Sequence, residues 1–153
     1  MNSFSATSLT CLRNDVVLFN GLDFRLDEGD ILQIQGPNGS GKTSLLRMLC
    51  GRALPDAGEI LWDGKNIHDQ RQHYFKEMSY IGHVNGIKME LTALENLMMA
   101  GALSVTDKNI SPFGALEKMG LAEYENTPAR KLSSGQRRRL ALARLLITAT
   151  RLW

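Results

Sequence analysis

One glycine-rich segment narrows the choice of fold more than any other part of this chain. It reads Gly36-Pro37-Asn38-Gly39-Ser40-Gly41-Lys42-Thr43 and satisfies every fixed position of the motif G-x-x-x-x-G-K-[ST]. Residues 30–35 are predicted to form a short buried strand before it, and residues 43–50 a helix after it that Gly51 ends. Glycines let a backbone wrap an anion without Cβ clashes, and a helix N-terminus adds partial positive charge. The segment therefore predicts a strand, loop and helix that bind the phosphates of a nucleotide.

Two side chains of this segment have predicted roles of their own. Lys42 can reach the β- and γ-phosphates, and the Thr43 hydroxyl is placed to ligate Mg²⁺. The backbone N–H groups of residues 36–41 are predicted to surround the phosphate oxygens. The alternative is a glycine-rich turn that matches the motif by accident, expected on the order of once in a few hundred chains of this length. Because a strand and a helix stand in register with the motif, we favour nucleotide binding.

Composition limits the remaining classes of function. The 153 residues suffice for one domain with a buried core, and the net charge of +2 is too small to indicate nucleic acid. No apolar run reaches the length of a bilayer span, so we expect any membrane role to be peripheral. The first residues lack the basic and apolar regions of a secretory signal. Cys11 and Cys50 have no metal-ligand spacing and are predicted to be buried thiols.

The rest of the chain divides into a strand-rich front and a helical second half. Apolar, β-branched or alternating segments predict strands at residues 8–12, 16–19, 22–26, 59–62 and 78–81. Asp63-Gly64 predicts a hairpin turn after the fourth of them. Helices are predicted at residues 91–103, 111–119 and 134–148. In the first of these helices, Leu91, Leu94, Leu97 and Met98 are expected on one face.

A second motif stands directly before the last predicted helix. It reads Leu132-Ser133-Ser134-Gly135-Gln136, which alone is an ordinary helix start with a serine cap. Together with the upstream loop it resembles the L-S-G-G-Q signature of the ATP-binding cassette (ABC) ATPases, with Ser134 in place of one glycine. The resemblance implies an α/β fold of the P-loop NTPase class, with ATP and Mg²⁺ as cofactors. It also implies that Ser133, Ser134, Gly135 and Gln136 contact the nucleotide held by a second copy.

The run Arg137–Arg139 follows the signature and has two interpretations. A basic cluster can bind nucleic acid, whereas an arginine run on a helix is more often a solvated face. We favour the solvated face and expect no nucleic-acid partner.

The resemblance covers essentially the whole chain and is closer to one branch of the family. That branch is the ATP-binding subunit of the bacterial haem exporter used in cytochrome c maturation. The segments that carry it are Gln35–Gly39, Thr43–Arg47, Gly58–Ile60 with Trp62, Gly82-His83, Gly86–Lys88, Glu90–Leu97, Gln136–Arg139 and Ala141–Arg144. It implies two kinds of partner, integral membrane permease subunits and a second copy, at the cytoplasmic face of the bacterial inner membrane.

The resemblance also implies how the domain is divided. Residues 1–88 and 130–153 are expected to form the catalytic core, with an antiparallel β subdomain, and residues 89–129 a helical subdomain. The segment from about Gly82 to Leu103 is expected to carry the surface for the membrane partner.

The chain departs from the family pattern at two contacts. Arg13 stands where the family has an aromatic side chain that stacks on adenine, and a guanidinium plane can also stack on a base. The family has a glutamine near Mg²⁺ and the attacking water, where this chain reads Gly82-His83-Val84-Asn85-Gly86. His83 or Asn85 could take its place.

The largest departure is that the sequence ends at Trp153. The family continues with a strand carrying the Walker B aspartate and glutamate, and with a later histidine. We therefore expect an incomplete core that binds ATP better than it hydrolyses ATP, because a positioned general base contributes roughly a hundred- to ten-thousand-fold in rate. Two alternatives stay open. One is a non-catalytic nucleotide-binding fragment, and the other is a soluble ABC-type ATPase without a transporter, which a second cassette would favour.

Overall fold

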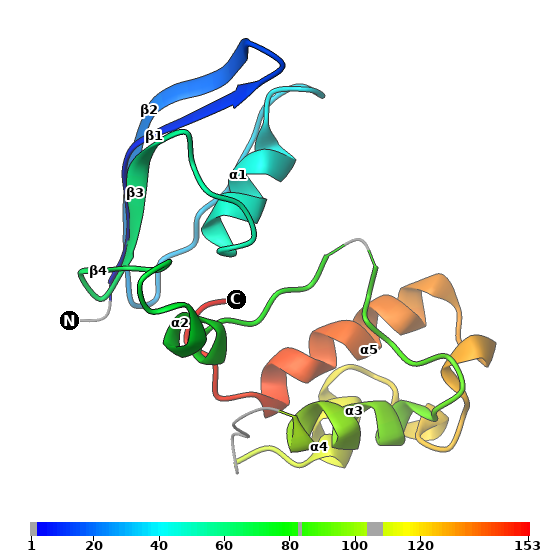
Figure 1. Ribbon diagram of the computed structural model, residues 1–153. Helices are drawn as coiled ribbons and strands as arrows, with labels where there is room; N and C mark the ends of the chain where they lie inside the picture. Colours follow the sequence, from blue (N-terminus) through cyan, green and yellow to red (C-terminus); the bar gives the residue numbers. More distant parts are fainter. Residues whose placement is uncertain (1–2, 83, 104–108) are drawn as a thin grey trace. The chain divides into compact units, whose positions relative to one another are not determined.

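The computed structural model describes residues 3–82, 84–103 and 109–153 (Figure 1). The chain separates into two compact units, Met1–Tyr74 and Phe75–Trp153. The phosphate-loop motif belongs to the first unit and the signature motif to the second. The division into a core and a helical subdomain at residues 89–129 stays a prediction. None of the described helices has both the length and the apolar composition needed to cross a bilayer.

The first unit is built on an antiparallel sheet of four strands in the order β2-β1-β3-β4. The strands are β1 (Ser3–Arg13), β2 (Val16–Asp27), β3 (Ala57–Trp62) and β4 (Lys65–Asn66). The two strands predicted at 16–19 and 22–26 form one continuous strand, β2. Within it, Gly21 has a positive φ of 66°. Asp63 and Gly64 both have positive φ, 51° and 75°, so the predicted hairpin turn between β3 and β4 is confirmed.

An aromatic cluster forms the core of this unit. The ring of Phe4 lies 5.7 Å from that of Phe24 and 6.0 Å from that of Trp62, measured between centroids. Tyr74 is almost fully buried, and its hydroxyl donates a hydrogen bond to the carbonyl of Leu49 at the end of α1 (Lys42–Leu49). Burial raises the pKa of Tyr74, so this hydroxyl keeps its proton and its role as a donor. The cluster thereby fixes the end of the helix that follows the phosphate loop.

Helix α1 confirms the helix predicted after the motif and its predicted end at Gly51. Gly51 has a φ of 64°, and its N–H donates to the carbonyl of Met48, while Arg52 N–H donates to the carbonyl of Arg47. These two bonds are the pair found in a Schellman C-cap, for which glycine is the usual residue.

Cys50 and Cys11 are buried free thiols, as predicted, and burial raises the pKa of Cys50.

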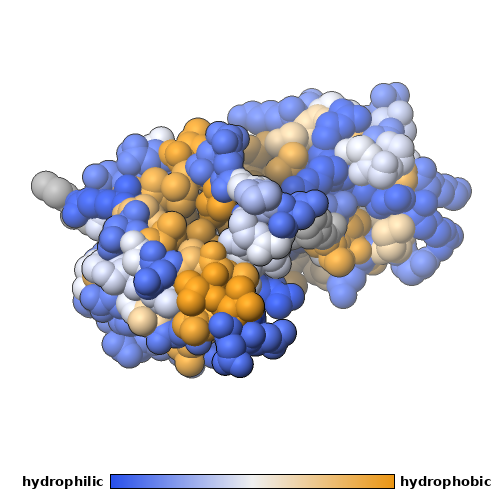
Figure 2. Space-filling model, turned by 90° about the horizontal axis from the view of Figure 1, so that it is seen from above, coloured by the Kyte–Doolittle hydropathy of each residue, from blue (hydrophilic) through white to orange (hydrophobic). Residues whose placement is uncertain are grey.

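The strand predicted at residues 30–35 is absent. Residues 30–37 have no regular secondary structure, and the Ile31 side chain is 92% exposed. A strand requires a neighbour to satisfy its N–H and C=O groups, and no ladder of the described residues includes this segment. Of the apolar residues that suggested a buried strand, Ile31 and Leu32 are exposed and Ile34 is half-buried. Hydrophobic side chains also gather on the face that Figure 2 shows. Val16 and Val17 at the β1–β2 hairpin are likewise exposed.

The second unit is helical (Figure 1). It contains the end of α2 (Arg71–Glu77), then α3 (Ala93–Ala102), α4 (Pro112–Lys118) and α5 (Ser134–Ile147), with short 3₁₀ turns at Ala122–Tyr124 and Ala129–Lys131. The three helices predicted for this half are confirmed. Their buried core is Ala93, Leu97, Ala115, Leu116, Leu121, Ala129, Leu132, Leu140, Ala143 and Ile147.

Two details of this unit differ from prediction. Met98 is 57% exposed, so it does not share the buried face of α3 with Leu97. The strand predicted at residues 78–81 is reduced to a single parallel bridge between Met78 and Leu152, with Ser79 N–H donating to the carbonyl of Leu152. One bridge does not make a ladder, so this segment lacks the repeated pairing that defines a strand.

Candidate nucleotide-binding site

The loop before α1 has the backbone shape that its glycines predict. Gly41 caps the helix at φ 89° and ψ 5°, and Gly39 has a φ of 87°, both in the left-handed region. A Cβ atom at Gly41 would come within 3.0 Å of the Leu18 Cβ and 3.1 Å of the Phe19 ring. Position 41 therefore requires glycine for two reasons, its backbone conformation and its contact with β2.

The start of α1 presents backbone donors that no acceptor of the described residues uses. Ser40 N–H donates to the carbonyl of Pro37 at 3.3 Å, and Leu45 N–H donates to that of Gly41. Within the described residues, the N–H groups of Gly39, Lys42 and Thr43 donate no hydrogen bond. Several free N–H groups at the positive end of a helix fit a multiply charged anion.

Lys42 places its positive charge on the same loop. Its Nζ donates to the carbonyls of Gly36 and Pro37, each at 2.7 Å. The Lys42 ammonium is thus held by the backbone of the loop that precedes α1. Thr43, the next residue, is exposed and offers a hydroxyl oxygen, the kind of hard ligand that Mg²⁺ prefers. The donors, the cation and the hydroxyl together suit a magnesium-bound polyphosphate.

Arg13 lies on the hairpin that contacts this loop. It is the last residue of β1 and pairs with Val16. Two residues earlier, Cys11 pairs with Phe19, whose ring lies against Gly41. Arg13 therefore stands near the end of the sheet that borders the loop, with an exposed side chain. Its contact with adenine stays a prediction.

The signature motif forms the first turn of α5. Ser133 is the N-cap, and its Oγ accepts from Gln136 N–H at 3.2 Å, while Gln136 Oε1 accepts from Ser133 N–H at 2.7 Å. This reciprocal capping box uses the side chains of Ser133 and Gln136, two of the four residues predicted to contact the nucleotide of a second copy. Ser134 and Gly135 between them are exposed. The structure therefore separates the predicted signature into two capping residues and two available ones.

Gly135 has no structural reason to be glycine within the described residues. A Cβ atom added there would meet no atom within 4 Å, and its φ lies outside the left-handed region. Gly135 is the second residue of α5, and its missing Cβ leaves room at the exposed helix start for another molecule to approach closely.

The three arginines after the signature are hydrogen-bonded rather than simply solvated. Arg137 donates to the carbonyl of Leu132 at 2.6 Å. Arg138 and Arg139 are exposed, but each donates to groups on other segments of the unit. The interpretation as a solvated face is therefore incomplete. The sequence did not indicate these hydrogen bonds, because most of their acceptors are backbone carbonyls.

Of the two candidates for the missing glutamine, only Asn85 is described. Its Oδ1 accepts from Arg138 Nη1 at 3.1 Å, and its backbone carbonyl accepts from Arg144 Nη1 at 3.4 Å. His83 lies outside the described residues. The proposed substitution of the glutamine therefore stays a prediction.

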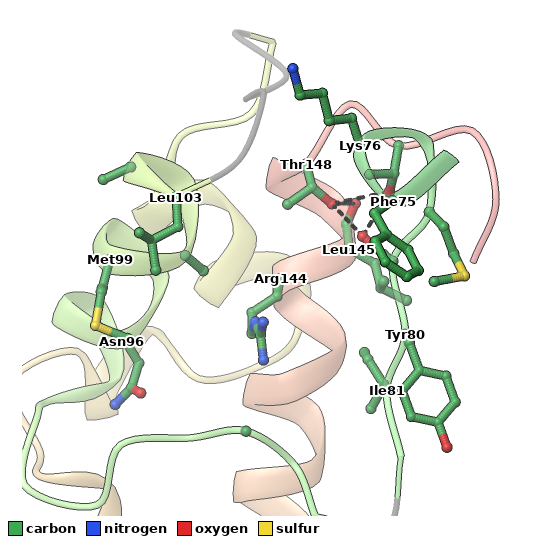
Figure 3. Close-up of a pocket in the computed structure, with 16 residues that line it drawn as sticks. Phe75, Lys76, Tyr80, Ile81, Asn96, Met99, Leu103, Arg144, Leu145 and Thr148 are labelled. Carbon is green, nitrogen blue, oxygen red and sulfur yellow. Dashed lines mark hydrogen bonds between the residues drawn. The ribbon is translucent and has the colours of Figure 1, made fainter. Parts of the chain in front are cut away.

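The second unit also contains a cavity of about 560 Å³ that the sequence did not predict. Figure 3 shows Arg144 extending into it, between α3 and the segment that includes Tyr80 and Ile81. The hydroxyls of Ser79, Thr148 and Thr150 form a hydrogen-bonded group in its wall. No local motif marks this cavity, because its lining residues come from segments far apart in the sequence.

Comparison with known proteins places these features in a wider context. The sequence profile of the family described as ABC transporter matches residues 19–153. The chain is 51% identical to the "Cytochrome c biogenesis ATP-binding export protein CcmA" of Nitrosospira multiformis, over 100% of this chain and 75% of that protein. It is 46% identical to the protein of the same name from Escherichia coli K12, over 100% of this chain and 72% of that protein.

A solved structure shows a similar fold. The chain resembles a structure titled "Structure of ATP binding subunit of ABC transporter", with a TM-score of 0.78 and 20% sequence identity. The match covers 92% of this chain and 60% of that one, so this chain spans about three fifths of the solved subunit. At this identity the likeness concerns the fold alone, and it confirms the fold class predicted from the sequence.

Proposed function

Since this chain belongs to the ABC transporter family, and within it to the cytochrome c biogenesis ATP-binding export proteins, we propose that it binds MgATP at residues 36–43. The observation that supports this most is that free backbone N–H groups at the start of α1 and an ammonium held on the loop carbonyls, that of Lys42, belong to one short segment. In this proposal the loop backbone and Lys42 hold the β- and γ-phosphates, and Thr43 ligates Mg²⁺. When bound, Mg²⁺ neutralises charge on the phosphate oxygens. Arg13 stacks on the adenine.

The exposed start of α5 is proposed to complete the site of a second copy. Ser134 and Gly135 are exposed, and the missing Cβ of Gly135 leaves room for a close approach of the partner's γ-phosphate. Ser133 and Gln136 support this contact by forming the capping box. Gly135→Val should weaken MgATP-dependent self-association while leaving the MgATP affinity of each monomer unchanged. Unchanged self-association in this variant would contradict the arrangement across two copies.

Residues 1–153 alone are proposed to bind ATP better than they hydrolyse it. Among the described residues, no Asp or Glu side chain hydrogen-bonds to residues 36–43, and a positioned general base contributes roughly a hundred- to ten-thousand-fold in rate. We expect ATP turnover by these residues to be indistinguishable from background. Turnover that Lys42→Ala abolishes would contradict this expectation.

The partners and the place of action are proposed from the relatives. Their printed name describes an ATP-binding export protein of cytochrome c biogenesis. An export system needs subunits that cross the membrane, so we propose integral membrane permease subunits as partners, at the cytoplasmic face of the inner membrane. Cytochromes c carry haem, so haem is the proposed cargo. A soluble ABC-type ATPase acting on ribosomes or DNA is the second candidate.

Cross-linking from the proposed partner surface distinguishes these two candidates. Lys88 is exposed, and the native Cys11 and Cys50 are buried, so Lys88→Cys introduces an accessible thiol. In cells expressing this variant, a thiol cross-linker should capture an integral membrane subunit. Lys65→Cys, an exposed position on β4, is the matched control and should capture much less. Capture of ribosomal or DNA-bound proteins alone would support the soluble candidate instead.

A further inference from the structure

Arg138 connects the first turns of α5 to a distant segment of the same unit. Its Nη1 donates to the carbonyl of Gly82 at 2.9 Å and to Asn85 Oδ1 at 3.1 Å. These partners lie 56 and 53 residues earlier in the sequence. Hydrogen bonds that involve a charged guanidinium are stronger than neutral ones. These two hydrogen bonds connect α5 to the segment that contains Gly82 and Asn85, and we call them the Arg138 tether.

The acceptors of Arg138 are themselves held in place. Asn85 accepts from Arg138 through its side chain, and its backbone carbonyl accepts from Arg144, six residues further along α5. Gly86 has a φ of 64°, and a Cβ atom there would lie 2.9 Å from Arg144 Nη1. Arg138 and Arg144 of α5 therefore both hydrogen-bond to Asn85. The next residue, Gly86, has a backbone conformation that favours glycine.

The tether lies next to the exposed residues of the signature. Arg138 follows Ser134 by four residues, a rise of about 6 Å along a helix. The two neighbouring arginines also form hydrogen bonds outside this turn. Arg137 donates to the carbonyl of Leu132, and Arg139 donates to the carbonyls of Met119 and Gly120. Because a helix turn is stiff, a tether one turn away restricts where Ser134 and Gly135 can lie.

We propose that Arg138 is a positioning residue, which holds the exposed start of α5 in the orientation that receives the nucleotide of a second copy. This inference rests on the proposed function, because it assigns Arg138 a role in the same contact. Arg138 does not touch nucleotide in this proposal. It acts through its hydrogen bonds to Gly82 and Asn85, which fix the position of the turn that carries Ser134 and Gly135.

The chain offers a matched control for this role. Arg139 is also exposed, lies in the same turn and donates from Nη1 to two acceptors, but ties the helix to Met119 and Gly120 instead. Arg138→Gln and Arg139→Gln each remove one charge and one pair of hydrogen bonds. Arg138→Lys keeps the charge and one donor group, and Asn85→Ala removes one acceptor without changing α5.

Two measurements on these variants test the proposal. In hydrogen exchange without nucleotide, Arg138→Gln should raise the exchange rate of the amides at residues 84–86, and Arg139→Gln should not. In MgATP-dependent self-association, Arg138→Gln should raise the dimer Kd at least about tenfold, while Arg139→Gln stays within about twofold. Arg138→Lys and Asn85→Ala should give intermediate values. The MgATP affinity of the monomer should not change in Arg138→Gln, Arg138→Lys or Arg139→Gln.

The outcomes separate this inference from the proposed function. If the unchanged protein associates on adding MgATP but the two glutamine variants are weakened equally, the positioning role of Arg138 is wrong and the proposed function stands. If the unchanged protein does not associate with MgATP at all, the contact across two copies is wrong, and the inference falls with it. Equal hydrogen exchange at residues 84–86 in both variants would show that the tether itself does not hold in solution.

Discussion

His68 is the histidine of the described residues whose pKa the fold displaces. Burial lowers the pKa of His68, and the positive charge of Arg71 lowers it further. Its Nε2 is buried and has no hydrogen-bond partner among the described residues. A proton on that nitrogen would therefore be buried without an acceptor, which is costly.

This displacement predicts a dependence of stability on pH. The unfolded chain, with a histidine pKa of about 6.5, binds a proton before the folded chain does as the pH falls. Stability is thus lost as the pH drops below about 6.5 towards the folded pKa. In thermal unfolding between about pH 7 and pH 5, His68→Gln should flatten the decline in Tm. His73→Gln removes an exposed histidine nearby and should leave the decline unchanged. Equal slopes in all three proteins would contradict the assignment.

Helix α3 depends on one buried amide. Asn96 is 3% exposed and donates from Nδ2 to the carbonyls of Lys88, Leu91 and Thr92, while its Oδ1 accepts from Lys88 N–H at 2.8 Å. The amide thereby satisfies the backbone of the segment that enters the helix. A buried group left without its partner costs about 1–3 kcal/mol.

We therefore expect Asn96→Ala to lower the free energy of unfolding by about 2–4 kcal/mol in denaturant titrations. Asn126 is exposed, and its Nδ2 donates to Glu125 at 3.1 Å. Asn126→Ala is the matched control and should change the free energy of unfolding by less than about 0.5 kcal/mol. A small effect of Asn96→Ala would mean that the entry segment of α3 does not rely on this amide.

The elements that the sequence predicts well are those that carry their own local signals. Helices α4 and α5 start at Ser111 and Ser133, serine caps whose hydrogen bonds the structure contains. The Asp63-Gly64 turn is likewise encoded by two adjacent residues. Residues 30–35 and 78–81 failed as strands because a strand needs a partner, and apolar composition alone does not supply one. The contacts of Arg138 were missed for the same reason, since their partners are distant in sequence.

At the scale of the whole molecule, the two motifs that carry the chemistry lie in different compact units. The phosphate loop belongs to Met1–Tyr74 and the signature to Phe75–Trp153. Both motifs were located from the sequence, because their residue types and spacing are set by the anion that they are predicted to contact. In the structure α1 begins with free N–H groups and α5 with an exposed Gly135, and the contact of both with an anion stays a prediction.

The central claim is that nucleotide binds at the loop before α1 and that Lys42 supplies the main charge. Calorimetric titration of MgATP into the protein and its variants tests this claim most directly. Lys42→Ala should weaken the affinity at least about tenfold, because a charge-assisted contact is worth about 1.5–3 kcal/mol, and Arg13→Ala should weaken it less. Arg47→Ala removes an exposed cation from the last turn of the same helix and should leave the affinity unchanged. An affinity that Lys42→Ala does not alter would contradict the assignment of residues 36–43 as the nucleotide site.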